Sequence, residues 1–150
     1  MILRTGLRLV EICETVVETI DRHSRPRANY HEAGGILIGS YRGIHIKVTD
    51  CTTPFPGDKR ARTLFDRCDH DHQRFAIERW RTSGKVSTFV GEWHTHPEAS
   101  PKPSSIDRRT WQKVAASNRA GPTFFLIRGY DGWWAGLGGP NRIAEMTELN

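Results

Sequence analysis

Two histidines and an aspartate near the middle of the chain have the types and spacing of metal ligands. His94 and His96 lie two residues apart in a β-prone run, residues 86–95, and a strand directs residues i and i+2 to one face. Pro97 ends this run, and Asp107 lies at the start of an amphipathic helix that brings its carboxylate back toward the imidazoles. Two neutral nitrogens and one carboxylate form a three-ligand set that leaves a fourth position for water, as in catalytic zinc sites.

The segment from Ser104 to Asp107 also has a purely structural interpretation. A serine followed three residues later by an acidic residue is typical of a capping box at a helix N-terminus. A His-x-His pair is also a weak signal alone, because histidines on strands are often packed or solvated. Both elements occur in one strand–loop–helix unit with no four-cysteine alternative nearby, and this combination favours a metal site.

These residues resemble the signature of the JAMM/MPN+ metalloprotease family. That signature is His-x-His-Pro followed by Ser-x2-Asp, with a glutamate far upstream. Residues 31–39, His-Glu-Ala-Gly-Gly-Ile-Leu-Ile-Gly, are similar to the family's upstream segment and make Glu32 the candidate glutamate. The resemblance implies one Zn²⁺ ion per chain, with three ligands: His94, His96 and Asp107.

The resemblance also implies a peptidase mechanism with two catalytic side chains. Glu32 is expected to remove a proton from the zinc-activated water and to deliver it to the leaving amine. It should not ligate zinc, because a fourth protein ligand would displace the water. Ser104 is expected to donate a hydrogen bond to the oxyanion of the tetrahedral intermediate.

The residues around the histidines narrow the resemblance further. Gly91 to Glu98, followed by Pro-Ser-Ser-x-Asp and a tryptophan, are similar to small stand-alone bacterial members, especially the deconjugating peptidases of antiphage nucleotidyltransferase operons. This implies a zinc-dependent isopeptidase or peptidase that releases a protein C-terminus, that of a nucleotidyltransferase or ubiquitin-like protein, from its target. Two alternatives remain: an inactive MPN-type scaffold or binding module, and a DNA-repair-associated JAB relative.

Length and composition predict a single domain over residues 1–150. The sequence is 37% hydrophobic, which suits one compact core. We expect a cytoplasmic protein without a membrane partner, because no apolar run resembles a membrane span or secretion signal. Cys13, Cys51 and Cys68 are irregularly spaced and are expected to be reduced thiols. The net charge of +5 is spread along the chain and does not favour nucleic acid. The sequence leaves the oligomeric state open.

The pattern of hydrophobic residues predicts an α+β fold with about three helices flanking a mostly antiparallel sheet, and the resemblance implies the α/β/α-like MPN/JAB fold with cytidine-deaminase-like topology. Helices are expected at residues 6–23, 69–83 and 106–118. Strands are expected at residues 34–40, 44–50, 86–95, 123–128 and 133–137, with a strand or helix at 142–149. Residues 51–67 are expected to form a loop.

Residues 68–72, Cys-Asp-His-Asp-His, form a second group of ligand types. On a helix, residues 68, 70 and 72 point in different directions, because side chains meet at spacings of three and four. We therefore interpret this segment as a helix start, with Asp69 or Asp71 complementing the helix N-terminus.

Several other charged residues have no firm role in this interpretation. Glu98 and Asp58 are carboxylates without an assigned role. Glu92 lies two residues before His94 on the predicted strand and could face the same side. In the predicted loop, a basic cluster is expected to steer an acidic substrate: Lys59, Arg60 and Arg62.

Overall fold

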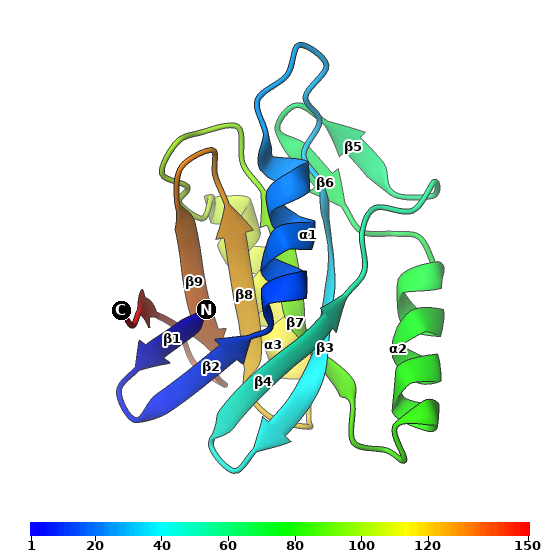
Figure 1. Cartoon of the computed structure of the whole chain (residues 1–150), viewed down its shortest axis with the longest axis vertical. Helices are drawn as coiled ribbons and strands as arrows, with labels where there is room; N and C mark the ends of the chain where they lie inside the picture. Colours follow the sequence, from blue (N-terminus) through cyan, green and yellow to red (C-terminus); the bar gives the residue numbers. More distant parts are fainter.

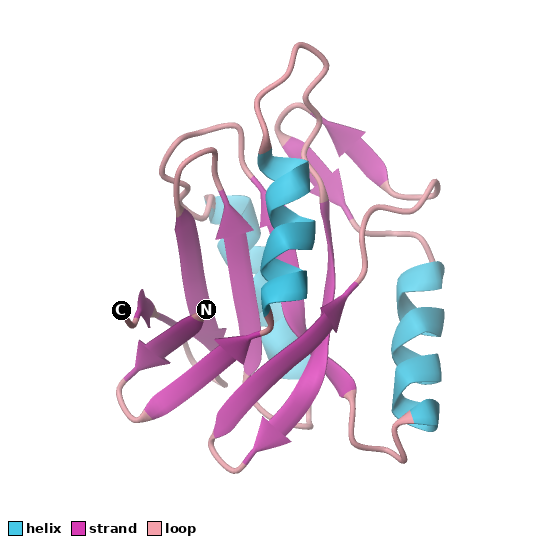
Figure 2. Cartoon of the chain, in the orientation of Figure 1, coloured by secondary structure: helices cyan, strands magenta, loops and turns pink.

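A nine-stranded sheet, with helix α1 on one face and α3 on the other, forms the body of the molecule in the computed structural model, which describes residues 1–150 (Figures 1 and 2). Its strands are β1 (Ile2–Thr5), β2 (Arg8–Ile12), β3 (Gly34–Arg42), β4 (His45–Cys51), β7 (Thr88–Thr95), β8 (Thr123–Arg128), β9 (Trp133–Gly138), β10 (Ile143–Glu145) and β11 (Thr147–Glu148). The helices are α1 (Glu14–Ser24), α2 (Asp71–Thr82) and α3 (Ser105–Ser117). None of them is long and apolar enough to span a membrane.

The strand order of the sheet is β10-β9-β8-β7-β3-β4-β2-β1-β11. Only the β2–β4 and β7–β8 ladders are parallel, and all other neighbours are antiparallel. The predicted α+β fold with a mostly antiparallel sheet and three helices is therefore confirmed. Strand β7, which carries His94 and ends one residue before His96, lies near the middle of the sheet between β3 and β8.

The last residues of the chain connect the two edges of the sheet. Strand β10 pairs with β9, and β11 pairs with β1 at the opposite end of the strand order. Between them, Met146 is buried, and its N–H donates to the carbonyl oxygen of Ala135 at 2.9 Å. The segment expected to be either strand or helix is thus two short strands.

Two hydrophobic clusters fix the helices on the sheet. The larger one contains Val16 and Ile20 of α1 together with buried side chains from several strands of the sheet. The smaller one lies under α3, where Trp111 stacks on Phe125 and on Trp134 at ring-centroid distances of 4.8 and 5.4 Å. Large side chains of this kind each stabilise the fold by about 1.5–3 kcal/mol when buried. The smaller cluster therefore anchors α3 to strands β8 and β9.

The first helix begins at Glu14, so the predicted start near Gly6 is wrong. Residues 8–12 form strand β2, in which Val10 and Ile12 are buried and Glu11 between them is exposed. Gly6 has a φ of 56° and lies in the β1–β2 turn. The apolar residues of this strand also fit the three- and four-residue spacing of the helix that follows it. The alternation of buried and exposed residues, which indicates a strand, is the competing signal.

The expected loop at residues 51–67 contains a small hairpin. Its strands are β5 (Lys59–Ala61) and β6 (Leu64–Asp66), which form a separate two-stranded sheet. Strands of three residues are too short to show a hydrophobic period. The other predicted helices and strands occur as expected, with ends that differ by a few residues.

Candidate metal centre

Strand β7 and the first turn of α3 bring His94, His96 and Asp107 together. His94 Nε2 lies 3.0 Å from His96 Nε2 and 3.4 Å from Asp107 Oδ1, and His96 Nε2 lies 3.3 Å from Asp107 Oδ2. A tetrahedral zinc ion with ligand bonds of about 2.0–2.1 Å separates neighbouring ligand atoms by about 3.3 Å. The two imidazole nitrogens and the carboxylate oxygen of Asp107 that is nearer to each of them are thus separated by distances close to this value, and the cluster can hold a metal ion.

The two histidines are held by their neighbours in the sheet. His94 lies opposite Gly34 of β3 and Ile127 of β8, and its ring lies 5.7 Å from that of Trp111. The Nδ1 atom of His96 is 2.9 Å from Glu98 Oε1, so this carboxylate fixes the ring with Nε2 toward the cluster.

Asp107 belongs to a capping box as well as to the cluster. The Ser104 hydroxyl oxygen accepts a hydrogen bond from the Asp107 N–H at 3.0 Å, and Asp107 Oδ2 accepts one from the Ser104 N–H at 2.7 Å. The capping interpretation and the metal-site interpretation are therefore compatible. Because the Ser104 oxygen acts as an acceptor, its own O–H proton remains free to donate to another group.

Glu32 lies just before β3, and its main chain is hydrogen-bonded to residues of strand β5. Its N–H donates to the carbonyl oxygen of Ala61 at 2.9 Å, and its carbonyl oxygen accepts from Arg60 Nε at 2.8 Å. The residue is only 6% exposed. Burial raises the pKa of Glu32 to about 7, although the charge of His96 lowers it. A carboxyl group with this pKa can gain and lose a proton near neutral pH.

The cluster attracts a positive charge. Burial lowers the pKa of His96, but hydrogen bonds to Asp107 and Glu98 outweigh burial and raise it to about 9. Burial raises the pKa of Asp107, but hydrogen bonds to His94 and His96 hold it well below its usual range. The metal-free cluster therefore carries an ionised carboxylate and a bound proton, and a metal ion would compete with that proton.

All five predicted site residues line one cleft of about 650 Å³. One wall is the β5–β6 hairpin with the residues that flank β6: Thr63, Leu64, Phe65, Asp66 and Arg67. The opposite wall is α3, which contributes Ile106, Thr110, Trp111 and Val114. A side chain at Gly34 would collide with the Phe65 ring, so glycine permits this close packing of the hairpin on β3.

The comparison with protein families identifies the class of this chain. Residues 15–140 match the family described as prokaryotic homologs of the JAB domain. The chain belongs to this JAB family. The solution structure of protein DSY2949 from Desulfitobacterium hafniense is similar in fold to this JAB chain, with a TM-score of 0.67, 21% identity and coverage of 91% of this chain and 88% of the other.

Curated relatives of this JAB chain carry peptidase names. A "CD-NTase/cGAS isopeptidase" of Pseudomonas aeruginosa is 38% identical over 81% of this chain and 77% of its own length. One of Escherichia coli with the same name is 34% identical over 93% and 88%. A "Probable metalloprotease y4qB" of Sinorhizobium fredii is 32% identical over 94% and 90%. This JAB chain is therefore a hydrolase of the peptidase class.

An ion pair in the JAB cleft is not predicted by the sequence. Arg67, which follows β6, binds Glu92 of β7, whose side chain is only 14% exposed. The two-residue spacing of Glu92 from His94 correctly indicates that Glu92 faces the cleft. Nothing in the sequence indicates its partner, because Arg67 lies in a segment whose composition predicts a loop. The sequence likewise gives Glu98 no role, although it lies only two residues beyond His96.

The second group of ligand types lies outside the JAB metal cluster. His72 is fully buried, with Nδ1 2.6 Å from Thr52 Oγ1 and Nε2 2.7 Å from Asp58 Oδ2. The helix-start interpretation is confirmed, because α2 begins at Asp71 and the N–H of Asp71 donates to Asp69 Oδ1 at 2.9 Å. This network anchors the loop that leads into the β5–β6 hairpin.

Proposed function

We propose that this JAB chain is a zinc-dependent isopeptidase that separates the C-terminus of a CD-NTase protein from the target to which it has been joined. The observation that carries the proposal is the cluster of two imidazole nitrogens and one carboxylate, close enough to share one ion, beside a buried carboxyl group in one cleft. The names of the curated relatives supply the substrate class.

The donor set supports zinc as the metal. Two imidazole nitrogens and one carboxylate oxygen, from His94, His96 and Asp107, with an open fourth position, form a ligand set of catalytic zinc sites. A bound zinc ion would polarise the scissile carbonyl group and lower the pKa of a water molecule toward neutrality.

Two side chains of the cleft would carry out the proton transfers and the charge stabilisation. The Glu32 carboxylate would take the proton of the attacking water and pass it to the leaving amine, a role that suits a buried carboxyl group in the same cleft as the metal ligands. The Ser104 hydroxyl would donate its free proton in a hydrogen bond to the oxyanion that develops on the scissile carbonyl.

The substrate would enter the cleft as an extended tail. Strand β6 pairs only with β5, so its second edge can accept an additional strand through main-chain hydrogen bonds. The tail would then lie between the β5–β6 hairpin and α3, with its last residue at the metal centre. Lys59 and Arg62 are exposed on the hairpin and would attract an acidic substrate.

A defined conjugate tests this function. A CD-NTase joined through its C-terminal carbonyl to a lysine of a second protein is incubated with zinc-loaded wild-type protein and with the Glu32→Ala variant. We expect mass spectrometry to detect one cut, directly after the C-terminal residue, with wild-type protein only. A ubiquitin-like protein conjugate serves as the comparison substrate. An intact CD-NTase conjugate after incubation with the zinc-loaded protein would overturn the proposal.

A further inference from the structure

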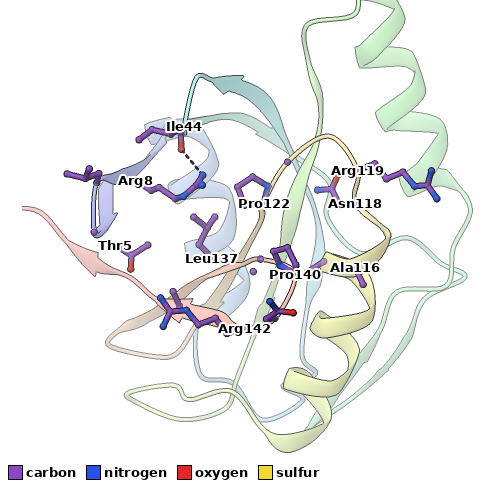
Figure 3. A pocket seen from close by; sticks show the side chains of 18 residues that line it. Thr5, Arg8, Ile44, Ala116, Asn118, Arg119, Pro122, Leu137, Pro140 and Arg142 are labelled. Carbon is purple, nitrogen blue, oxygen red and sulfur yellow. Dashed lines mark hydrogen bonds between the residues drawn. The ribbon is translucent and has the colours of Figure 1, made fainter.

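A second cavity, of about 1200 Å³, lies at the C-terminal end of α3 (Figure 3). The first turn of α3 contributes to the metal cluster, whereas its last turn, at Ala115 and Ala116, lines this cavity. The turns β1–β2 and β3–β4 and the segment after β9 complete the walls. Eight residues separate Asp107 from Ala115, which is roughly 12 Å along the helix, so a ligand of the cavity does not have to reach the metal cluster.

The charged side chains that line this cavity are all basic. Among its 18 lining residues, the three charged ones are Arg8, Arg119 and Arg142, and no aspartate or glutamate is present. None of these arginines forms an ion pair. Arg8 only donates a long hydrogen bond, 3.4 Å, to the carbonyl oxygen of Ile44 (Figure 3). Three guanidinium groups are therefore available for carboxylates of a ligand.

The remaining surface of the cavity is largely aliphatic. Leu7, on the β1–β2 turn, is 85% exposed, and Ile44, on the β3–β4 turn, is 48% exposed. In the view of Figure 3, Leu137, Pro122 and Pro140 lie between Arg8 on one side and Arg119 on the other. Contiguous apolar surface with a polar rim is typical of a protein-binding site.

We propose that this cavity is a docking site for an acidic peptide segment of a partner protein, whose aliphatic side chains contact Leu7 and Ile44. Carboxylates of the segment pair with the three arginines, in agreement with the net charge of +5. No aromatic side chain lines the cavity for stacking on a nucleotide base, and its volume exceeds the range of about 300–1000 Å³ that is common for small ligands.

This docking site goes beyond the proposed peptidase function. A segment bound near the C-terminal end of α3 leaves the metal cluster at the N-terminal end of the helix open. The chain can therefore hold a partner protein while an extended tail occupies the metal centre. Binding at this cavity requires neither zinc nor turnover, so its test is independent of the test for conjugate cleavage.

A displayed library of random peptides identifies segments that bind this cavity. The library is selected on wild-type protein after depletion on a variant that combines Arg8→Glu, Arg119→Glu and Arg142→Glu. We expect the selected peptides to combine aspartate or glutamate with leucine, isoleucine or valine. No enrichment, or enrichment of peptides without acidic residues, would contradict the proposal.

Fluorescence polarisation of one selected, labelled peptide then measures the contribution of each surface. We expect the triple charge reversal to weaken binding at least about tenfold, because attraction becomes repulsion. Leu7→Ser should weaken it about tenfold as well, because an aliphatic contact is lost. The matched control is Arg25→Glu, at an exposed arginine that does not line the cavity, and it should bind like wild type. Equal binding by the triple variant and wild type would overturn the docking site.

The same measurement separates this inference from the proposed function. His94→Ala removes a predicted metal ligand far from the cavity and should leave peptide affinity unchanged. Loss of peptide binding in this variant, with its fold retained by circular dichroism, would assign the peptide to the metal cleft and overturn the docking site.

Discussion

Arg60 Nε donates a hydrogen bond to the main-chain carbonyl oxygen of Glu32 at 2.8 Å. A second nitrogen of the same guanidinium group donates to the carbonyl oxygen of His31, and the Glu32 N–H is bound by Ala61. The sequence suggests Arg60 as a steering residue for acidic substrates, but its side chain is committed to these contacts. Arg60 is therefore a positioning residue, which holds Glu32 against the β5 strand.

We expect Arg60→Ala to lower kcat about tenfold without loss of metal, because Glu32 loses one of its two main-chain anchors. The control is Arg62→Ala, which removes an exposed arginine of the same hairpin and should change KM rather than kcat. Steady-state kinetics and metal analysis of both variants provide the measurement. A normal kcat for Arg60→Ala would show that the anchor is not needed for catalysis.

The two roles of Asp107 can be separated by a conservative change. Asp107→Asn retains an acceptor for the Ser104 N–H but lacks the charge that a metal ligand needs, so it should fold normally and lose both zinc and activity. Ser104→Ala should have the opposite outcome. It should keep the metal but lose about 1 kcal/mol of stability, because the helix loses its cap. Elemental analysis and thermal unfolding distinguish the two variants. One equivalent of zinc in Asp107→Asn would remove Asp107 from the ligand set.

Glu32→Gln tests the general base. This variant should keep its zinc while activity falls by about 10²–10⁴-fold, because an amide cannot accept the proton. Catalysis by the wild-type protein should decline with falling pH as Glu32 becomes protonated. Near-normal turnover by the variant would end the assignment.

The same substitution should alter the pH dependence of stability in the metal-free protein. Burial raises the pKa of Glu32 from 4.5 to about 7, so the folded state favours the protonated form. The stabilisation is complete below the unfolded value and is lost as pH rises through about 7. Glu32→Gln should therefore be more stable than wild type above neutrality, by about 1–3 kcal/mol, and similar to it in acid. Denaturant unfolding at several pH values measures the difference, and an advantage that is larger in acid would contradict the burial of this carboxyl group.

Metal binding should release a proton from His96. Its pKa of about 9 in the metal-free chain means that the ring is protonated at neutral pH, and only the neutral ring can ligate a metal. Zinc affinity should therefore increase about tenfold per pH unit from about pH 6 to about pH 8. Competition with a chelator measures this dependence, and calorimetry in buffers of different ionisation enthalpy counts the protons. A pH-independent affinity would show that His96 does not ligate the ion.

The buried His72–Asp58 pair should stabilise the segment that precedes the β5–β6 hairpin. His72→Ala leaves the fully buried Asp58 carboxylate without its imidazole partner and should cost about 3–5 kcal/mol. Because Asp58 also accepts hydrogen bonds from the N–H groups of Phe55, Cys68 and Asp69, we expect amide exchange to increase over residues 55–69. The control is His45→Ala, which changes a partly exposed histidine of β4 whose Nδ1 accepts a hydrogen bond from the N–H of Leu9. Equal stability of the two variants would contradict this role.

The grouping of four of the candidate site residues could be predicted from the sequence because they lie in short, local units, whereas Glu32 is indicated only by the family resemblance. His94 lies on β7 and His96 directly follows its end, while Ser104 and Asp107 are the cap and the first turn of α3, so the period of each element fixes their relative direction. The pairing of Glu92 with Arg67 and of His72 with Asp58 depends on how the hairpin segment folds back over the sheet. Such long-range contacts leave no periodic signal.

The predicted fold differs from the structure where strand pairing, rather than the local sequence, determines the conformation. The sequence around strand β2 predicts a helix because Val10, Cys13 and Val16 happen to continue a helical spacing across a strand–helix boundary. The closing strands β10 and β11 are so short that pairing with β9 and β1, rather than local preference, determines their conformation.

The closing strands also bring the two ends of the chain together (Figure 1). The N–H of Leu149 donates to the carbonyl oxygen of Ile2 at 2.9 Å. A short glycine-rich linker can therefore join the ends, and new ends can be opened at Gly84, which has a φ of 67° in an exposed turn after α2. Such a circularly permuted protein would place a fused reporter beside the β7 strand that leads to His94, on a part of the surface away from Ile2 and Leu149.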